Sequence, residues 1–510
     1  MSFDAYADDL TVAIAGVGAM GQGIAQIAAQ AGLRVLLFDA QPGMAAKACE
    51  AVGRALTTLV DKGRLSAEAA TAAALRLHTV DSLAAFAPAA LVVEAIVEQL
   101  AAKQQLFREL EHIVTAECVL ATNTSSLSVT EIAAACERPQ RVAGFHFFNP
   151  VPLMKIVEVI DGVRTDRAVG DALLALGARL GHSAVRAKDT PGFIVNHAGR
   201  GYGTEALRLL GEDVASPAVI DDILRERAGF RLGPFELLDL TGLDVSVPVM
   251  ESIYRQYFDE PRYRPSPLGA QRRAAGLLGR KSGEGFYRYD NGRTVAAAVA
   301  SVPALNSLPV WIDRSDAEWG AAAERLFAGL GATIERGERP SRDALCVVTP
   351  AGEDVTSCCA REGLDPRRTI GIDLLVQSPR RRTLMLSPLT SSDVRDAAHA
   401  LLAADGARVS IVRDSAGLVV QRVLAMIVNI GCDIAQQGIA SPADIDRAVT
   451  LGLGYPHGPL SWGDRLGATR VLALLERMLA LSGDPRYRPS PWLRRRARLG
   501  VSLTTAEPAL

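Results

Sequence analysis

The sequence predicts four parts of two kinds: an α/β domain with a largely parallel sheet, an all-helical domain, a reduced α/β domain, and a second copy of the helical domain. Two observations predict this order. Short apolar strands alternate with longer helical stretches between positions 1 and 190. Beyond them the chain repeats itself at a nearly constant offset, which indicates a duplicated domain. We expect boundaries at residues 1–190, 191–290, 291–412 and 413–510.

The composition is that of an ordinary globular protein. The 510-residue chain is 49% hydrophobic and 22% charged, with a formal net charge of −2. This charge gives no reason to expect nucleic acid or an anionic membrane surface as a partner. We interpret the arginine runs at residues 380–382 and 494–498 as solvated faces.

Cysteine usage and hydropathy bear on the compartment. The seven cysteines lack metal-ligand spacing and their number is odd, so we expect a reduced, cytoplasmic protein without disulfides or a metal site. The N-terminus carries acidic residues and no apolar core of a signal peptide. No uncharged apolar run approaches the ~18 residues of a membrane span, so we expect no membrane segment.

The first strand, residues 11–16 (TVAIAG), leads into a glycine motif. Gly16, Gly18 and Gly21 form GxGxxG at the start of a helical stretch, and Asp39 ends the next strand, residues 34–39. Such glycines permit a tight turn, the approach of a pyrophosphate and close helix–strand packing. Asp39 would accept from ribose hydroxyls and repel a 2′-phosphate. The pattern predicts a Rossmann-like domain that binds NAD rather than NADP; the alternative is a glycine turn that only permits packing.

Polar residues stand where the next strands end. Further strands are predicted at residues 75–80, 89–96 and 118–126. Because ligands bind at the carboxyl ends of parallel strands, we place Glu98, Asn123 and Ser125 near the cofactor crevice. Ser126 follows directly, and for it a helix cap is an equally good interpretation.

Residues 141–159 (RVAGFHFFNPVPLMKIVEV) contain one histidine, His146, and one carboxylate, Glu158, in mainly apolar surroundings. We expect two adjacent strands here, which would bring imidazole and carboxylate within reach of each other, as in a general-base pair. A core histidine beside a solvent-facing glutamate explains these residues alone equally well.

Seven stretches taken together resemble one family. In chain order between positions 1 and 290 they are VAIAGVGAMGQGIA, VVEAIVE, TNTSSL, RVAGFHFFNPVPLMKIVEV, KDTPGFIVN, GPFELLD and KSGEGFYRY. They resemble the L-3-hydroxyacyl-CoA dehydrogenases. The resemblance implies NAD-dependent oxidation of an L-3-hydroxyacyl-CoA to the 3-oxoacyl-CoA, without a metal.

The resemblance also implies residue roles. His146 is then the general base, Glu158 orients it, Ser125 contacts the nicotinamide side and the substrate's 3-oxygen, and Asn196 positions the substrate. The implied cofactor-binding positions are Gly16, Gly18, Gly21, Asp39, Glu98, Lys103, Asn123, Ser125 and Asn149.

The phosphates of coenzyme A would need cations. The helical region after Asp39 contains Lys47, Arg54, Lys62 and Arg64, of which we name Arg54 and Lys62 as candidate substrate contacts. Plain surface charges are the alternative for all of them.

The internal repeat has a nearly fixed offset, which carries position 189 to position 414. DTPGFIVN (189–196) matches DSAGLVVQ (414–421), ASPAVID (215–221) matches ASPADID (440–446), and PRYRPSP recurs in full at 261–267 and 485–491. The copy has Gln421 in place of Asn196 and lacks GxGxxG, TNTSS and the histidine block, so we expect one active site per chain and no second NAD site. We expect the two helical domains to pack together as an intrachain pseudo-dimer; further homo-oligomerisation stays open.

The duplicated form resembles bacterial enzymes that act on 3-hydroxybutyryl-CoA or, in phenylacetate breakdown, on 3-hydroxyadipyl-CoA. The latter substrate ends in a carboxylate, and Arg200, four positions after Asn196, is a candidate clamp on the same helix face. An ordinary surface or salt-bridging arginine is the alternative. Two other functions stay open: an NAD-dependent dehydrogenase of a free hydroxy acid or sugar acid, and a non-catalytic NAD-binding scaffold.

Overall fold

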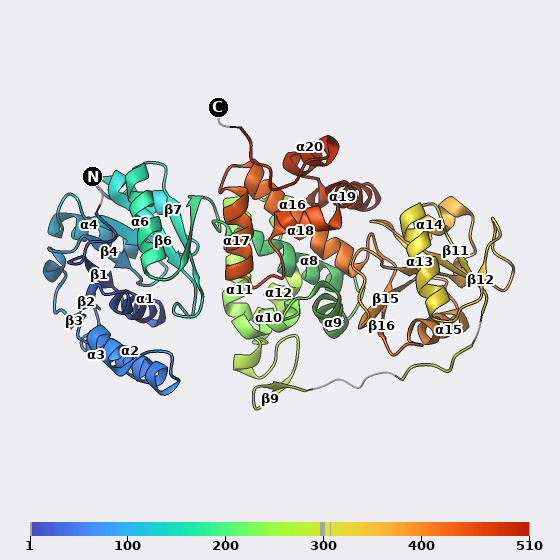
Figure 1. Cartoon of the computed structure of the whole chain (residues 1–510), viewed down its shortest axis with the longest axis horizontal. Coiled ribbons are helices and arrows are strands. Elements are labelled where there is room, and N and C mark those ends of the chain that lie inside the picture. The colour runs from blue at the N-terminus through green and yellow to red at the C-terminus, as the bar shows by residue number, and fades with distance from the viewer. Residues whose placement is uncertain (1–2, 296–300, 307, 509–510) are drawn as a thin grey trace. The chain divides into compact units, whose positions relative to one another are not determined.

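The computed structural model describes residues 3–295, 301–306 and 308–508 and divides into two compact units. Unit 1 comprises Met1–His197 and Gln437–Leu453, and unit 2 comprises Ala198–Gln436 and Gly454–Leu510. The elements follow the predicted order of α/β, helical, α/β and helical parts (Figure 1). One short segment of the second helical repeat belongs to unit 1, which the sequence did not indicate.

An eight-stranded sheet forms the centre of unit 1, in the order β3-β2-β1-β4-β5-β6-β7-β8. Its strands are β1 (Thr11–Ala15), β2 (Arg34–Phe38), β3 (Leu77–Thr79), β4 (Leu91–Glu94), β5 (Val119–Thr122), β6 (Val142–Phe147), β7 (Ile156–Asp161) and β8 (Ser183–Lys188). All neighbours are parallel except β6 and β7. Strands β1, β4, β5 and β6 are buried along their whole length, as expected where helices cover both faces of a parallel sheet.

Helices cover both faces of this sheet. They are α1 (Ala19–Gln30), α2 (Met44–Asp61), α3 (Ala67–Ala74), α4 (Leu100–Ile113), α5 (Val129–Ala133), α6 (Arg167–Arg179), the short α7 (Val195–Ala198) and α17 (Pro442–Gly452). Two separate apolar cores result. One contains Ile24 of α1 and Leu173 of α6, and the other contains Phe107 of α4 and Ile132 of α5. This three-layer arrangement confirms the Rossmann-like prediction.

The helical repeats supply most of unit 2. The first contains α8 (Arg200–Gly211), α9 (Pro217–Ala228), α10 (Pro234–Thr241), α11 (Leu243–Gln256) and α12 (Pro267–Ala274), and the second contains α16 (Val419–Gln436), α18 (Pro459–Leu466), α19 (Ala468–Ser482) and α20 (Pro491–Leu499). A small hairpin, β9 (Tyr289–Asp290) and β10 (Arg293–Thr294), follows the first repeat.

Among the described residues, α16 is the one helix long and apolar enough to cross a membrane by length and composition, and 89% of it is buried inside the protein. Its apolar side chains pack against other helices of unit 2, including α8 and α18.

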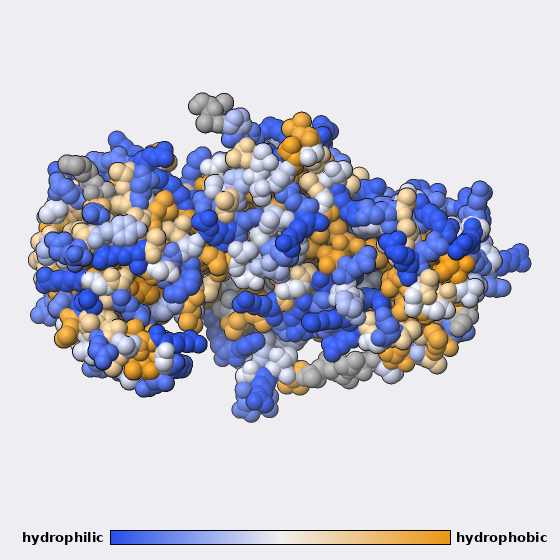
Figure 2. Space-filling view, viewed as in Figure 1, coloured by the Kyte–Doolittle hydropathy of each residue, from blue (hydrophilic) through white to orange (hydrophobic). Residues whose placement is uncertain are grey.

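On the face drawn in Figure 2, hydrophilic residues predominate and hydrophobic ones are scattered between them.

A second, six-stranded sheet belongs to unit 2, in the order β12-β11-β13-β14-β15-β16. Its strands are β11 (Val310–Ile312), β12 (Ile334–Glu335), β13 (Leu345–Val348), β14 (Thr369–Ile372), β15 (Arg381–Leu386) and β16 (Arg408–Arg413), with helices α13 (Ala317–Gly329), α14 (Val355–Glu362) and α15 (Ser392–Leu402). Among these strands, only β14 and β15 pair antiparallel. The predicted reduced α/β domain is therefore present; residues 296–300 and 307 of the predicted 291–412 range lie outside the described residues.

The duplication extends into this second sheet. The repeat offset carries β7 onto β15 and β8 onto β16, and both pairs are parallel in the same register. In each sheet the strand before this pair runs antiparallel to it: β6 pairs antiparallel with β7, and β14 pairs antiparallel with β15. The second α/β domain therefore retains the last part of the first, which explains why the sequence shows strands there without the phosphate-binding glycines.

The expectation that the arginine runs are solvated faces is wrong for two members. Arg381 is 7% exposed and forms ion pairs with Asp222 and Glu226 at 2.9 Å each. Arg496 is 5% exposed, lies over the ring of Trp492 and donates to the Thr505 carbonyl. The partners of Arg381 come from a distant segment, and those of Arg496 lie four and nine residues away, so neither set is visible in the run of arginines itself.

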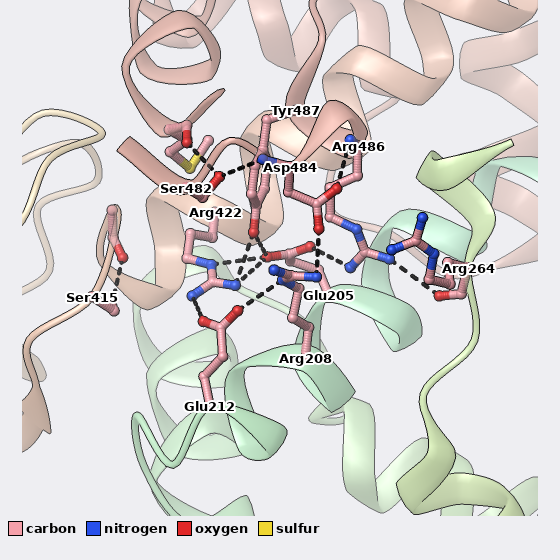
Figure 3. A network of polar contacts seen from close by, with 12 residues as sticks. Glu205, Arg208, Glu212, Arg264, Ser415, Arg422, Ser482, Asp484, Arg486 and Tyr487 are labelled. Atoms are coloured by element: carbon pink, nitrogen blue, oxygen red, sulfur yellow. Dashed lines mark hydrogen bonds and ion pairs between the residues drawn. The ribbon is translucent and has the colours of Figure 1, made fainter. Parts of the chain in front are cut away.

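The two helical repeats contact each other through buried charges (Figure 3). Glu205 of α8 is fully buried and accepts from Arg422 of α16 and from Tyr487, both in the second repeat, at 2.8 and 2.7 Å. Arg486 adds an ion pair at 3.2 Å. Burial by itself would raise the pKa of Glu205, but the two arginines outweigh it and hold the pKa below its ordinary value.

A matching contact runs the other way. Arg262 and Tyr263 of the first repeat bind Asp433 of the second, with the guanidinium 2.7 Å and the phenol 3.2 Å from the carboxylate. Arg262 also donates to the Arg488 carbonyl, as Arg486 does to the Arg264 carbonyl. Each copy of the PRYRPSP motif therefore reaches a carboxylate of the other repeat.

Candidate active site

His146 and Glu158 face each other across the one antiparallel pair of the first sheet. They are direct partners in the register of β6 and β7. His146 Nδ1 lies 2.7 Å from Glu158 Oε2, and the side chains are 5% and 0% exposed. A solvent-facing glutamate, the alternative that the sequence left open, is not what the structure shows.

The second oxygen of Glu158 is also occupied. Glu158 Oε1 accepts from the backbone N–H groups of Ile194 and Val195, at 2.9 and 3.0 Å. These residues belong to the DTPGFIVN stretch at the start of α7. The carboxylate is thereby fixed from two sides, so its orientation toward the imidazole does not depend on the side chain's own rotamer preference.

Ser125 and Asn196 are linked in the structure. Asn196 Nδ2 donates to the Ser125 carbonyl at 3.3 Å. Ser125 follows β5, which is the parallel neighbour of β6, so Ser125 and His146 stand at the same end of adjacent strands. The structure thus gathers His146, Glu158, Ser125 and Asn196 at the carboxyl edge of the sheet, where a parallel α/β sheet binds ligands.

Glu98 holds the Ser125 loop. Its Oε1 accepts from the backbone N–H groups of Ser125 and Ser126, at 2.9 and 3.1 Å, and from the Thr124 hydroxyl at 2.7 Å. Burial would raise the pKa of Glu98, but the Lys103 charge and these hydrogen bonds outweigh it and lower the pKa below 4.5. Glu98 is accordingly a carboxylate at neutral pH.

Lys103 is buried beneath this loop, at 1% exposed. Its ammonium lies 2.6 Å from Glu94 and 3.2 Å from Glu98. Glu94 is fully buried and also accepts from the Thr122 hydroxyl. Glu94 is not among the residues predicted from the sequence, although it shows the same signal as Glu158, a carboxylate within a buried apolar strand.

The glycine motif forms a cradle that fits a dinucleotide phosphate. A Cβ at Gly21 would lie 2.0 Å from the Gly16 carbonyl oxygen, and Gly16 has φ +92°, so both positions require glycine. A Cβ at Gly18 would meet nothing within 4 Å, so space is open above it. Gly18 is the N-cap of α1 and offers no side-chain cap, which leaves the first N–H groups of the helix as anion donors.

The remaining predicted cofactor positions lie around this cradle or the same strand ends. Asp39 follows β2 and accepts from the Val17 N–H at 3.1 Å. Asn123 follows β5 and accepts from the Phe147 N–H at 2.8 Å. Asn149 is exposed in the loop after β6. Their contacts with a nucleotide stay predictions.

Of the predicted substrate cations, Arg54 and Lys62 lie far from this cluster in the sequence, and Arg200 follows Asn196 by four positions. Arg54 of α2 is exposed and pairs with Glu50 at 3.7 Å, and Lys62 is exposed at the end of α2. Arg200 begins α8, while Asn196 lies in α7, with Gly199 between the two helices. Burial lowers the pKa of Arg200 to about 10, which leaves it charged at neutral pH. The described residues contain no group of three or more His, Cys, Asp or Glu that could hold a metal.

Comparison with known proteins agrees with this site. Residues 11–190 match the family description 3-hydroxyacyl-CoA dehydrogenase, NAD binding domain. Residues 192–289 and, separately, 417–506 match 3-hydroxyacyl-CoA dehydrogenase, C-terminal domain. The chain belongs to the 3-hydroxyacyl-CoA dehydrogenase family. Its enzyme class is therefore NAD-dependent oxidoreductase, and the double match confirms that the helical domain is duplicated.

Relatives occur in a long and a short form. A 3-hydroxyadipyl-CoA dehydrogenase of Escherichia coli K12 is 38% identical over 96% of this chain and 98% of its own length. A probable 3-hydroxybutyryl-CoA dehydrogenase of Bacillus subtilis is 39% identical over 55% of this chain and 97% of its own length. A crystal structure of a 3-hydroxybutyryl-CoA dehydrogenase from Escherichia coli K12 superposes with a TM-score of 0.84 at 37% identity, covering 96% of this chain and 98% of that one.

Proposed function

We propose that this chain oxidises an L-3-hydroxyacyl-CoA to the 3-oxoacyl-CoA, with His146 as general base. The observation that carries this proposal is the buried pair of His146 Nδ1 and Glu158 at 2.7 Å. Because Glu158 occupies Nδ1, Nε2 is the nitrogen left to exchange a proton with substrate. The pair follows the logic of histidine–carboxylate pairs in other enzymes, where the carboxylate fixes the tautomer and stabilises the imidazolium.

The residues divide the work as follows. His146 Nε2 takes the proton of the 3-hydroxyl group, and Glu158 stabilises the positive charge that forms on the ring. Ser125 and Asn196 hydrogen-bond the oxygen that becomes a carbonyl. The cradle of Gly16, Gly18 and Gly21 would hold the pyrophosphate of NAD+, which would supply the hydride acceptor for C3.

The test is the initial rate of NAD+ reduction with a panel of 3-hydroxyacyl-CoA thioesters and their free acids. We expect thioesters to be oxidised faster than the free acids, and the His146→Gln variant to lose turnover while still binding NADH. Faster oxidation of a free hydroxy acid would support the alternative substrate class. Unchanged turnover in His146→Gln would overturn the role of the pair and favour a non-catalytic scaffold.

For the acyl group we propose 3-hydroxyadipyl-CoA or 3-hydroxybutyryl-CoA, the substrates in the names of the long Escherichia coli relative and of the short relatives. Arg200 would clamp the distal carboxylate of the first. Its charge at neutral pH and its place four positions after Asn196 support this assignment. The Arg200→Met variant should lose activity on 3-hydroxyadipyl-CoA and keep it on 3-hydroxybutyryl-CoA; equal losses on both would refute the clamp. A wild-type preference for 3-hydroxyadipyl-CoA in the same panel would favour a role in phenylacetate breakdown, and a preference for 3-hydroxybutyryl-CoA would favour a role in β-oxidation.

We also propose that the two helical domains act as a pseudo-dimer within one chain. The support is the pair of reciprocal contacts, Glu205 with the second PRYRPSP motif and Asp433 with the first. A chain ending at about residue 295 would expose the buried Glu205 and the apolar surface around it. We expect such a truncation to aggregate or self-associate in size-exclusion chromatography. A monomeric, stable and fully active truncation would contradict the proposal.

We also propose that the domains end at residues 190, 290 and 412 and that the protein is cytoplasmic. The seven cysteines form no disulfide with one another, and six of them are buried, which supports a reducing compartment.

A further inference from the structure

A segment of the second helical repeat packs on the active-site sheet. Residues 437–453, which include α17, belong to the same compact unit as the first sheet. The Lys188 N–H at the end of β8 donates to the Ile439 carbonyl at 2.9 Å, and α17 lies against β7 and β8. Strand β7 carries Glu158. The two halves of the chain are therefore connected at the strand that holds the catalytic carboxylate.

The last residue of α17 contacts the loop that holds Glu158. A Cβ at Gly452 would lie 2.9 Å from Cγ2 and 3.0 Å from Cγ1 of Val195. Because both methyl groups are this close, rotation about χ1 cannot move both away. The backbone N–H of Val195 is one of the donors to Glu158 Oε1. A displacement of Val195 is thus transmitted to Glu158 through a single hydrogen bond, and from Glu158 to His146.

A similar contact between a helix and a strand end occurs at the second sheet. Helix α9 is the counterpart of α17, and the Arg413 N–H donates to the Val214 carbonyl as Lys188 does to Ile439. At the repeat offset, the counterpart of Gly452 is Arg227. Arg227 donates to the Thr383 hydroxyl at 2.8 Å and lies 3.6 Å from Asp373.

These two partners of Arg227 occupy the positions of the catalytic pair. Thr383 is the counterpart of Glu158 at the repeat offset, in the matching strand β15. The pairing of Ile372 with Leu384, continued by one residue, sets Asp373 opposite Thr383, as His146 stands opposite Glu158. Arg227 therefore contacts the counterparts of the catalytic pair directly, whereas Gly452 contacts Val195, a backbone donor to Glu158.

We propose that α17 of the second helical repeat is a positioning element of the active site, and that Gly452 is its critical residue because a side chain there displaces Val195 and with it Glu158. The second repeat then contributes to turnover as well as to stability. This inference rests on His146 and Glu158 being the proton-transfer pair.

The test compares four full-length variants: Gly452→Ala, Val195→Ala, the double variant, and Gly329→Ala as the matched control. Gly329 also ends a helix, α13, and a Cβ there would meet nothing within 4 Å. Gly452 is outside the left-handed backbone region, and alanine is the better helix former, so without the Val195 contact the melting temperature would be unchanged or raised. A purely structural contact would lower the melting temperature and leave kcat of the folded variant normal.

We expect Gly452→Ala to lower kcat about tenfold to a hundredfold, the range that a misplacement of up to about 1 Å at an active site can produce. The KM for NAD+ should change little, because the glycine cradle is untouched. Val195→Ala removes both clashing methyls and leaves the remaining Cβ at 3.6 Å, an ordinary contact, so the double variant should recover most of the lost kcat.

Normal kcat in Gly452→Ala, or a loss that Val195→Ala does not relieve, would overturn the inference. A failure of the proposed function itself would be seen separately, because His146→Gln would then keep its turnover. If Gly452→Ala is too unstable to assay, the melting temperature of the double variant decides in its place. Recovery there would support the contact, and no recovery would refute it.

Discussion

Replacing Glu158 by glutamine isolates the contribution of its negative charge. The amide keeps the size and shape of the carboxylate, and its oxygen can still accept from the N–H groups of Ile194 and Val195. The other end becomes an N–H₂ group facing His146 Nδ1, where the carboxylate oxygen lies at 2.7 Å. An amide donor there forces Nδ1 to accept, which moves the ring proton to Nε2, the nitrogen that should take the substrate's proton. The variant therefore holds the wrong tautomer and leaves the imidazolium uncompensated.

The magnitude follows from the geometry. Two unit charges about 4 Å apart interact by about 4 kcal/mol at an effective dielectric constant of about 20. Losing this stabilisation in the transition state corresponds to a fall in kcat of about 10³-fold. The equivalent substitution in a serine protease triad costs about 10⁴-fold, because the tautomer is lost as well. We expect Glu158→Gln to fall between these values.

The assay is steady-state NAD+ reduction with a 3-hydroxyacyl-CoA, with circular dichroism melting to monitor the fold. Asp161→Asn is the matched control, since Asp161 lies on the same strand but pairs with Arg186 at 2.6 Å, away from the histidine. Its kcat should equal that of the wild type. A loss of less than tenfold in a folded Glu158→Gln variant would show that the carboxylate does not orient or stabilise the imidazole.

Three further predictions concern two other carboxylates, the buried Glu205 and the partly exposed Glu98. Arg422→Met leaves Glu205 short of one cation, so unfolding in urea should show a loss of about 3–5 kcal/mol. Because Arg486 also pairs with Glu205, the compensating variant replaces Glu205 by leucine and both arginines by methionine; it should recover much of the loss, and an equally unstable triple variant would contradict the ion-pair account. Since the pKa of Glu205 is lowered by folding, its contribution is present above pH 4.5 and lost as pH falls through the folded pKa, so the wild type and Glu205→Gln should converge in stability toward acid pH. Glu98 also has a lowered pKa, so it is ionised at neutral pH and Glu98→Gln should weaken NADH binding there, as measured by fluorescence titration. The difference in affinity between variant and wild type should shrink only below pH 4.5. A variant that binds NADH as tightly as the wild type at pH 7 would refute the role of Glu98 in holding the Ser125 loop.

The sequence was most informative where the signal is local. Strands β1 and β2 begin at the predicted residues, because continuous apolar runs between turn residues mark buried parallel strands. The cluster around His146 was also predictable, since a polar residue at a strand end or within an apolar strand stands out. By the same signal Glu94 could have been found, and only its distance from the histidine block left it unnoticed.

Contacts that join distant segments were not predictable from local patterns. Arg381 sits in a run of arginines, which taken alone indicates a solvated face, and its partners Asp222 and Glu226 lie more than 150 residues away. The place of α17 in the active-site unit was equally hidden. Its sequence, ASPADID onward, matches the first repeat, and nothing in that match indicates that this helix packs on β7 and β8.

The second half shows how a duplicated site can lose its chemistry while keeping its fold. Gln421 stands in place of Asn196 and donates to the Pro350 carbonyl, just as Asn196 donates to the Ser125 carbonyl at the matching place in the first half. It also donates to Asp373, at 3.3 Å. Arg227 of α9 adds a hydrogen bond to the Thr383 hydroxyl and an ion pair with Asp373, so protein side chains bind one another at the counterpart of the catalytic pair. The first half has Gly452 and Asn196 at these positions, so it lacks the two longer side chains that bind Asp373 in the second half.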